Sequence, residues 1–574
     1  MRIARALILC AIVVAVGVVL VSGGERGGPR TPAALPGLPP PFLGTAVTGD
    51  GRLTAAVDAY GDVVDLRPGP AGAALIDNPA DRQAAGTVPS DTGIVPRVRI
   101  GGGEPMAMWE ADRVGQRYLA GTNVVRTVAW FGGDRGGPAA RVVMTVAASG
   151  DELALAMRGR GGDEGGVSVT PSVGVDVRAG VRCARERRVA ILYLLCRSGR
   201  GARPLSGGAV GGGVGSATAG VVRAARADAR RWLLGSRGLG AAAPSWARSM
   251  YARSLLTVQA LTSRRTGAVA AGARDGWAYV WPRDAASAAL ALEASGHRAE
   301  ARAVARFLTG LDLGAAARFT EAGAPVPGRA AQGDALGWVT VAARAAHTPA
   351  PARPLPWRDR ADYQESSPGT YLGNALAATA TDVDGRRTRR ADGISAARRI
   401  LGEFGTRAGL VRVAGDPGSG LDSAAGWAVR PFGLRALYPA AELTLRRLVA
   451  DGTPYGITPG EGWEGGEDPW TAPTAWSAWA LAALAAEGRG APDRRAALGL
   501  LADLRRASTP AGDLPERVGV ETGVPTSTTP LLWSSAFAVL ALRELWPWRR
   551  APLMGRATGG GSCGTGGCGR AARR

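Results

Sequence analysis

Hydrophobic residues in the first third of the chain recur in short runs that fit β-strands. The runs NVVRTVAWF (123–131), ARVVMTVAAS (140–149) and ELALAMR (152–158) alternate or are rich in β-branched residues, and Gly, Asp and Pro separate them. The stretch LTAAVDAYGDVVDL (53–66) alternates as well and turns at Gly61-Asp62. Short strands with turn residues between them are typical of two packed antiparallel sheets. We therefore expect an antiparallel β-sandwich over residues 43–205.

From position 247 onward the hydrophobic period changes to about 3.6 residues. Alternate helix-like segments are uniformly apolar or small and would form an inner ring, whereas the amphipathic segments between them would lie outside. A weak, proline-flanked piece, LPWRDRA (355–361), would complete a set of twelve. The pattern predicts an (α/α)6 helical barrel over residues 247–548. Besides the piece at 355–361, the eleven helix-like segments are 249–262, 284–296, 297–311, 334–347, 370–383, 391–405, 422–430, 440–451, 472–488, 491–507 and 528–545.

The remaining segments read as connections and ends. Two arginines precede an apolar run within residues 1–24, which predicts a signal peptide or a signal anchor and places most of the chain outside the cytoplasm. Residues 25–42 are rich in Gly and Pro and fit a linker. Residues 206–246 combine a Gly/Ala-rich loop with a linker helix, VVRAARADARRWLL. Residues 549–574 form a Gly/Arg-rich tail.

Charge and cysteine content indicate which binding partners and which compartment we expect for the protein. The formal net charge is +21, and every basic residue other than the two histidines is an arginine. These arginines are scattered and do not form a basic stripe interleaved with aromatics, so we expect no nucleic-acid partner. A solvated basic surface is the plain interpretation, and affinity for anionic cell-wall polymers or lipid headgroups is the alternative. Cys183 and Cys196 flank a strand-like run and could form a disulfide in an oxidising compartment.

Acids, amides and tryptophans recur in the loops that precede the inner helices. In a closed ring of helical hairpins these loops would meet at one end, so Arg283 and Asp284 would point into a shared pocket. These loops contain no metal-ligand set, no GxSxG motif and no phosphate loop, and we expect no metal or cofactor. Paired carboxylates beside aromatic rings are what glycoside hydrolysis requires. The six loops contain WPRD, AAQGD, DYQESSPG, GSGLD, EGGEDPW and LPERVGVETG.

Several of these motifs, in this order, resemble those of glycoside hydrolase family 15, the glucoamylase-like enzymes. The resemblance covers residues 249–545, and the strand-rich region resembles the β-sandwich that precedes the barrel in bacterial members. The segments that carry it are RSLLTVQALTSRRTGAVAAG (253–272), YVWPRDAA (279–286), QGDALG (332–337), DYQESSPGTYLGNA (362–375), GGEDPW (465–470) and LPERVGVETGVPTSTTPLLWSSA (514–536).

The resemblance implies an inverting, exo-acting hydrolase of α-glucosidic bonds that works from the non-reducing end of a glucan or oligosaccharide. Glu365 matches the general acid, with a pKa raised by burial, and Glu516 matches the general base, which stays ionised. Arg283 and Asp284 would hold sugar hydroxyls. Trp281 and Trp470 would stand beside the sugar, the latter as an aromatic wall. We expect the protein to be a monomer.

The sequence also departs from the family pattern. Gln364 replaces the tryptophan that usually precedes the acid, and Ser535 replaces a histidine near the end. These departures keep two alternatives open, a non-catalytic protein that binds cell-envelope glycan through the same funnel and a phosphorolytic α-glucosidase. Gln332 and Asp334 read more simply as a helix cap and its neighbour than as ligands.

Overall fold

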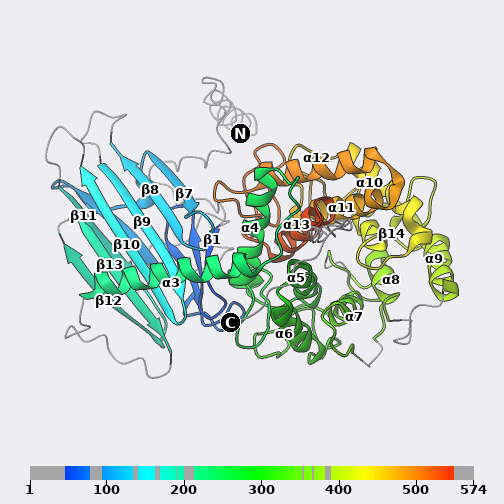
Figure 1. Cartoon of the computed structure of the whole chain (residues 1–574), viewed down its shortest axis with the longest axis horizontal. Helices are drawn as coiled ribbons and strands as arrows, with labels where there is room; N and C mark the ends of the chain where they lie inside the picture. The colour runs from blue at the N-terminus through cyan, green and yellow to red at the C-terminus, as the bar shows by residue number, and fades with distance from the viewer. Residues whose placement is uncertain are drawn as a thin grey trace, which may run out of the picture.

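A β-sandwich is joined by a long helix to a ring of helices (Figure 1). This computed structural model describes residues 45–77, 93–132, 140–161, 168–188, 190–199, 213–351, 355–364, 367–381 and 390–548. The predicted signal segment, linker and C-terminal tail lie outside these residues, as does Glu365. Within them, none of the helices combines the length and the apolar character that crossing a membrane would need.

The first sheet of the sandwich has the order β1-β2-β3-β5-β11, with β4 and β6 paired to its middle strands. Both faces of β1, β2 and β3 are buried, although β2 and β3 lie within a run that predicts alternation. Val57 packs into the sandwich core, whereas Val47, Ala56 and Val64 join the core of the barrel. The barrel thus covers the face that water would otherwise occupy. The strands are β1 (Thr45–Gly49), β2 (Thr54–Asp58), β3 (Val63–Arg67), β4 (Ile76–Asp77), β5 (Ile94–Ile100), β6 (Met106–Ala107) and β11 (Val169–Val175).

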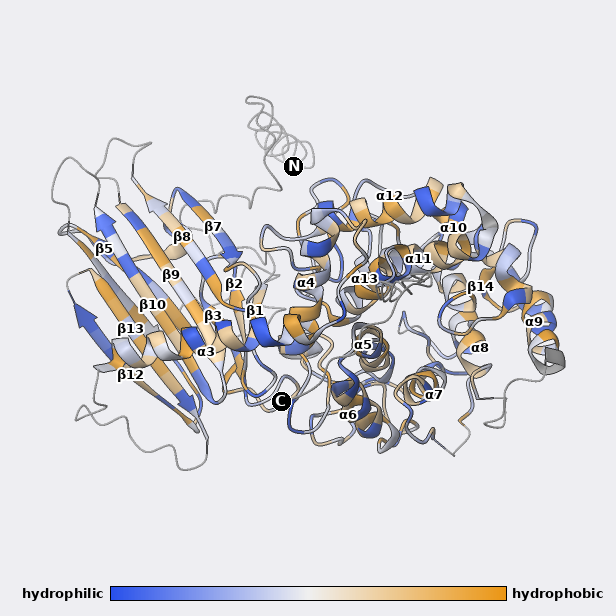
Figure 2. Cartoon of the chain, viewed as in Figure 1, coloured by the Kyte–Doolittle hydropathy of each residue, from blue (hydrophilic) through white to orange (hydrophobic). Residues whose placement is uncertain are grey.

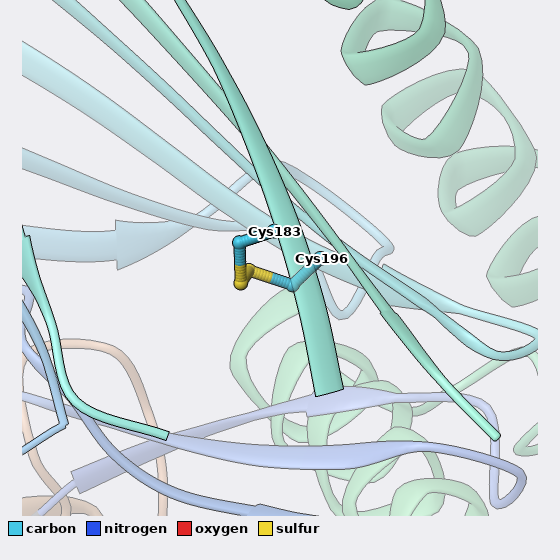
Figure 3. Close-up of a disulfide and its surroundings, with 2 residues drawn as sticks. All are labelled: Cys183 and Cys196. Atoms are coloured by element: carbon cyan, nitrogen blue, oxygen red, sulfur yellow. A yellow bond between two sulfur atoms is a disulfide. The ribbon is translucent and has the colours of Figure 1, made fainter. Parts of the chain in front are cut away.

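The second sheet has the order β12-β13-β10-β9-β8-β7, and all its pairs are antiparallel. Hydrophobic and hydrophilic residues alternate along strands such as β9, so one face packs into the sandwich core (Figure 2). A disulfide joins Cys183 to Cys196 at directly paired positions of β12 and β13 (Figure 3). The strands are β7 (Arg113–Tyr118), β8 (Val125–Phe131), β9 (Ala140–Ser149), β10 (Glu152–Gly161), β12 (Val181–Arg188) and β13 (Ile191–Ser198).

Helix α3 (Gly213–Gly235) crosses the outer face of the second sheet and leads to the barrel (Figure 1). Val221 packs on Ala154 and Leu195, which lie on β10 and β13. The helix contains the predicted linker helix and begins earlier, within the stretch expected to be a Gly/Ala-rich loop. Gly215 permits this start, because a Cβ there would lie 2.8 Å from a ring carbon of Tyr193.

Six inner elements form a closed ring in which each packs on the next. This arrangement confirms the predicted barrel following a sandwich. All residues of α11 are buried, as expected for an inner helix, and the element over 423–428 is a 3-10 helix. The ring runs through α5 (Pro282–Ser295), α7 (Ala335–Ala345), α8 (Leu372–Ala378), η4 (Ser423–Ala428), α11 (Thr471–Leu484) and α13 (Leu532–Leu545).

The outer layer has five helices within the described residues, because the twelfth predicted segment is not helical. Residues 355–361 form a turn and isolated bridges, with Asp359 at a φ of 54°. The Asn374 side-chain amide accounts for this, since it points at the carbonyls of Trp357, Arg360 and Ala361. The outer helices are α4 (Ser245–Ala260), α6 (Arg298–Thr309), α9 (Arg390–Phe404), α10 (Tyr438–Ala450) and α12 (Ala491–Ala507).

Candidate active site

The loops that precede the inner elements meet at one end of the ring. Isolated backbone bridges join these loops to one another. In four of the bridges, one partner either directly precedes an inner element or lies in the sequence motif before it. Because the loops are bridged to one another, the side chains at the starts of the inner helices surround one space. The four bridges are Gly272 with Leu531, Gln332 with Ala361, Asp422 with Gly460, and Trp470 with Arg517.

Arg283 occupies the first turn of α5 and is 4% exposed. Its guanidinium donates to Gln332 Oε1 at 3.0 Å and to Asp334 Oδ2 at 2.9 Å, and its Nη2 lies 3.4 Å from Asp284 Oδ2. It also lies 4.6 Å above the centre of the Trp533 ring. Burial alone would lower the pKa of Arg283, but the carboxylates of Asp334 and Asp284 raise it above its ordinary value. The guanidinium therefore remains charged and fixed.

Asp284 lies next to this cation, yet its pKa is raised above its ordinary value. Burial raises the pKa of Asp284 to about 7, with contributions from Asp334 and Glu516, while Arg283 acts in the opposite direction. Its Oδ2 is buried and accepts no hydrogen bond within the described part of the chain. This oxygen faces Arg283 Nη2 at 3.4 Å and can also accept a hydrogen bond from a hydroxyl of a bound molecule.

Glu516 is held from both its backbone and its side chain. Its N–H donates to the Thr528 carbonyl at 2.9 Å, and its own carbonyl accepts from the Thr471 N–H at 3.0 Å. The carboxylate accepts from the Ser527 hydroxyl and from Trp277 Nε1, the latter at 3.4 Å. Burial raises the pKa of Glu516, whereas these two hydrogen bonds lower it. The bonds thus favour the ionised form that a general base needs.

Trp281 and Trp470 immediately precede α5 and α11. Trp281 is buried beside Tyr279, and the Arg318 guanidinium lies 5.7 Å from its ring. Trp470 is half-buried and meets Trp463 edge to face at 5.7 Å. Trp470 therefore contributes a partly open aromatic surface near Glu516, because its backbone pairs with that of Arg517.

The chain just before Glu365 is anchored beside Arg283. Gln332, which binds Arg283, also donates to the Asp362 carbonyl at 2.8 Å. The Tyr363 hydroxyl then donates to Asp422 Oδ1 at 2.8 Å, and Gln364 Nε2 donates to that hydroxyl at 2.7 Å. Glu365 itself lies outside the described residues, so its position relative to Glu516 stays a prediction.

The sequence favoured a capping role for Gln332 and Asp334 over a role in the site, and it did not indicate Trp277 or Ser527. Asp334 makes no side-chain cap to α7, and Arg283 instead binds both Asp334 and Gln332. The motif QGD before an inner helix was the available signal. Trp277 and Ser527, the partners of Glu516, carried no comparable signal, because neither stands in a spacing that marks a role.

The comparisons with known proteins agree with this architecture. The sequence model described as "Glycosyl hydrolases family 15" matches residues 245–313. A bacterial glucoamylase, solved in complex with acarbose, is 12% identical and has a TM-score of 0.59, with 92% of this chain and 96% of that chain covered. Glucoamylase from Saccharomycopsis fibuligera is 15% identical with a TM-score of 0.40, covering 54% of this chain and 96% of that one.

No curated protein matches the sequence. At 12% identity the likeness to the bacterial glucoamylase shows the fold alone, and the range matched by the family model contains α4, α5 and α6. The chain matches glycoside hydrolase family 15 over residues 245–313, and its sandwich and barrel share the fold of a bacterial glucoamylase.

Proposed function

We propose that the protein is a glycoside hydrolase that removes glucose, with inversion, from the non-reducing end of an α-glucan or oligosaccharide. One observation carries the proposal. A buried Arg–Asp pair and a hydrogen-bonded glutamate, Glu516, lie at the same end of the ring and influence each other, since Glu516 contributes to the raised pKa of Asp284.

The proposed roles follow from the surroundings of each side chain. Glu516, oriented by Trp277 and Ser527, activates the attacking water. Glu365 protonates the glycosidic oxygen from the opposite side. An inverting reaction places these carboxyl groups about 6.5–9.5 Å apart, with the water and the sugar between them. Arg283 and Asp284 hold hydroxyls of the terminal sugar, while Trp281 and Trp470 pack beside its ring.

The exo preference is supported by the burial of the charged side chains at the starts of α5 and α7. Arg283, Asp284 and Asp334 are each at most 4% exposed, and in the proposed binding mode they would close the inner end of the site to a longer chain. A chain end with free hydroxyls fits such a floor, since hydroxyls can satisfy Asp284 Oδ2. The reaction requires no cofactor.

Location outside the cytoplasm is part of the same proposal. The disulfide between Cys183 and Cys196 supports it, because disulfides persist in oxidising compartments.

Purified full-length protein would be tested on maltotriose, isomaltose and trehalose by measuring glucose release. Glu516→Gln and Glu365→Gln should each lower kcat by about 10²-fold or more, the scale of lost acid–base catalysis. Glu521→Gln is the matched control, because Glu521 is exposed in the same loop. NMR of the first product should show inversion at the anomeric carbon.

Three outcomes would overturn the proposal. Undetectable glucose release with retained oligosaccharide binding would identify a glycan-binding protein. Turnover that requires inorganic phosphate would identify a phosphorolytic enzyme. Equal activity of Glu516→Gln and the wild type would remove Glu516 from the mechanism.

A further inference from the structure

A hollow of about 370 Å³ lies on the sandwich, on the outer face of the second sheet. Residues of β8, β9, β10 and β13 line it, and none of its lining residues belongs to the barrel. These strands lie on the sandwich side of the molecule, well separated from the inner helix α11 (Figure 1). The hollow is therefore a site distinct from the candidate active site.

Strand register explains the shape of the hollow. Thr145 and Ala156 are paired across β9 and β10, and Val143 is paired with Arg158 in the next outward-facing row. Small side chains at Thr145 and Ala156 form a low floor. In the row beyond, Arg141 of β9 is paired with Arg160 of β10, so long side chains rise at the edge.

The rim is strongly basic. Arg126, Arg141, Arg158 and Arg160 line the hollow, and no acidic residue does. None of the four has an ion-pair partner within the described residues, and Arg126 Nε is buried without a hydrogen-bond acceptor. Four cations around one concavity repel each other and create a positive potential that an anion would relieve.

We propose that this hollow binds an acidic polysaccharide, a linear sugar polymer that carries carboxylate groups. The planar guanidinium fork of arginine matches a carboxylate in two parallel hydrogen bonds. The small floor side chains of Thr145 and Ala156 leave room for the face of a sugar ring, whereas the Tyr193 ring packs against Gly215 of α3. The volume falls in the range of small-ligand pockets, so one or two sugar units fit within it.

Two other polyanions fit these observations less well. A bilayer surface would favour exposed apolar side chains, but the large hydrophobic residues that are exposed in the described chain lie elsewhere. Single-stranded nucleic acid would need open aromatic platforms. The nearby Trp130 does not offer one, because the Arg113 guanidinium covers its ring at 4.0 Å.

The experiment measures binding of the full chain to immobilised polygalacturonate at physiological salt. The test variant carries Arg126→Gln, Arg141→Gln, Arg158→Gln and Arg160→Gln. The control variant loses the same charge from exposed positions on outer barrel helices, through Arg302→Gln, Arg306→Gln, Arg447→Gln and Arg495→Gln. We expect the test variant to bind roughly 30-fold more weakly and the control less than about threefold.

The ligand is varied in parallel. Methyl-esterified polygalacturonate keeps the sugar backbone but lacks most of the charge, and we expect it to bind at least about tenfold more weakly. Equal loss in the control variant, or equal binding of the ester, would overturn the proposal. So would stronger variant-sensitive binding to polyphosphate or to phosphatidylglycerol vesicles, which would assign the hollow to another polyanion.

Two further measurements keep the test decisive. If the fourfold variant fails to fold, Arg158→Gln with Arg160→Gln removes two exposed arginines of one strand and should weaken binding about fivefold. Glucose release should be unchanged in all these variants, so failure here and failure of the proposed hydrolase activity are distinguishable.

Discussion

Replacing Arg283 with methionine would remove a buried cation from between two buried carboxylates and leave the volume of the side chain nearly filled. In the native protein the guanidinium contacts Asp334 at 2.9 Å and Asp284 at 3.4 Å, and it is 4% exposed. Breaking a buried pair by removing one partner costs about 3–5 kcal/mol, because the other charge stays buried without compensation. We expect Arg283→Met to reduce the free energy of unfolding of the barrel by that amount at pH 8.

The loss should depend on pH in a defined direction. Burial already raises the pKa of Asp284 to about 7, and without Arg283 the pKa values of Asp284 and Asp334 would rise further. A carboxyl group whose pKa is higher in the folded state binds more protons when folded, so acid stabilises the folded form. The difference between variant and wild type should therefore be largest above pH 7 and shrink toward about pH 4, the unfolded value.

Urea unfolding followed by tryptophan fluorescence measures this difference, because only Trp109 and Trp130 of the 16 tryptophans belong to the sandwich. Arg298→Met is the control, since Arg298 pairs with Glu293 at 3.1 Å but is 54% exposed at its side chain. We expect it to cost at most about 1 kcal/mol. A cost below about 1 kcal/mol for Arg283→Met, or one independent of pH, would refute the reasoning.

Three further predictions concern the base, the ring and the sandwich. Ser527→Ala removes a hydrogen bond that lowers the pKa of Glu516, so the acid limb of the kcat/KM profile should move to higher pH; an unmoved limb would contradict this. Gly337→Ala should lower the free energy of unfolding in urea by about 1–3 kcal/mol, because the added Cβ would lie 2.1 Å from a carbonyl oxygen of α8. The control Gly402→Ala, in open space on α9, should raise the free energy of unfolding by up to about 1 kcal/mol. Replacing both disulfide cysteines with serine should cost the sandwich about 2–3 kcal/mol in calorimetry, for a bridge that spans 13 positions; an unchanged melting profile would contradict the expectation.

The ring of inner helices was predictable because inner helices differ from outer ones in composition. A helix buried on every side, such as α11, has almost no hydrophobic asymmetry, whereas α6 is amphipathic. Alternation failed as a guide in β2 and β3, because the barrel buries the face that a free sandwich would expose. The missing outer helix at 355–361 also depended on a distant residue, since Asn374 binds the carbonyls of that segment.

The charged residues of the candidate site could be predicted from the sequence, but the residues that hydrogen-bond to them could not. Arg283, Asp284 and Glu516 stand in motifs at helix starts or in the last loop, and the fold brings their surroundings together. Trp277 lies 239 positions from Glu516, so no local pattern could pair them. The side chains that orient a functional group are chosen by the three-dimensional packing, and the sequence marks them only once the fold is known.

The arrangement of charges at the floor of the ring has a further consequence for how the site works. Arg283 contacts Asp334, and Asp334 is 0% exposed, so this ion pair cannot exchange partners with solvent. Asp284 is held near the same cation but keeps an oxygen without a hydrogen-bond partner among the described residues. A buried polar atom left unpaired costs free energy that a correctly placed hydroxyl can recover. Under the proposed function, Asp334 and Gln332 would fix the guanidinium before the ligand arrives, and Asp284 would offer an oxygen to a hydroxyl of the chain end.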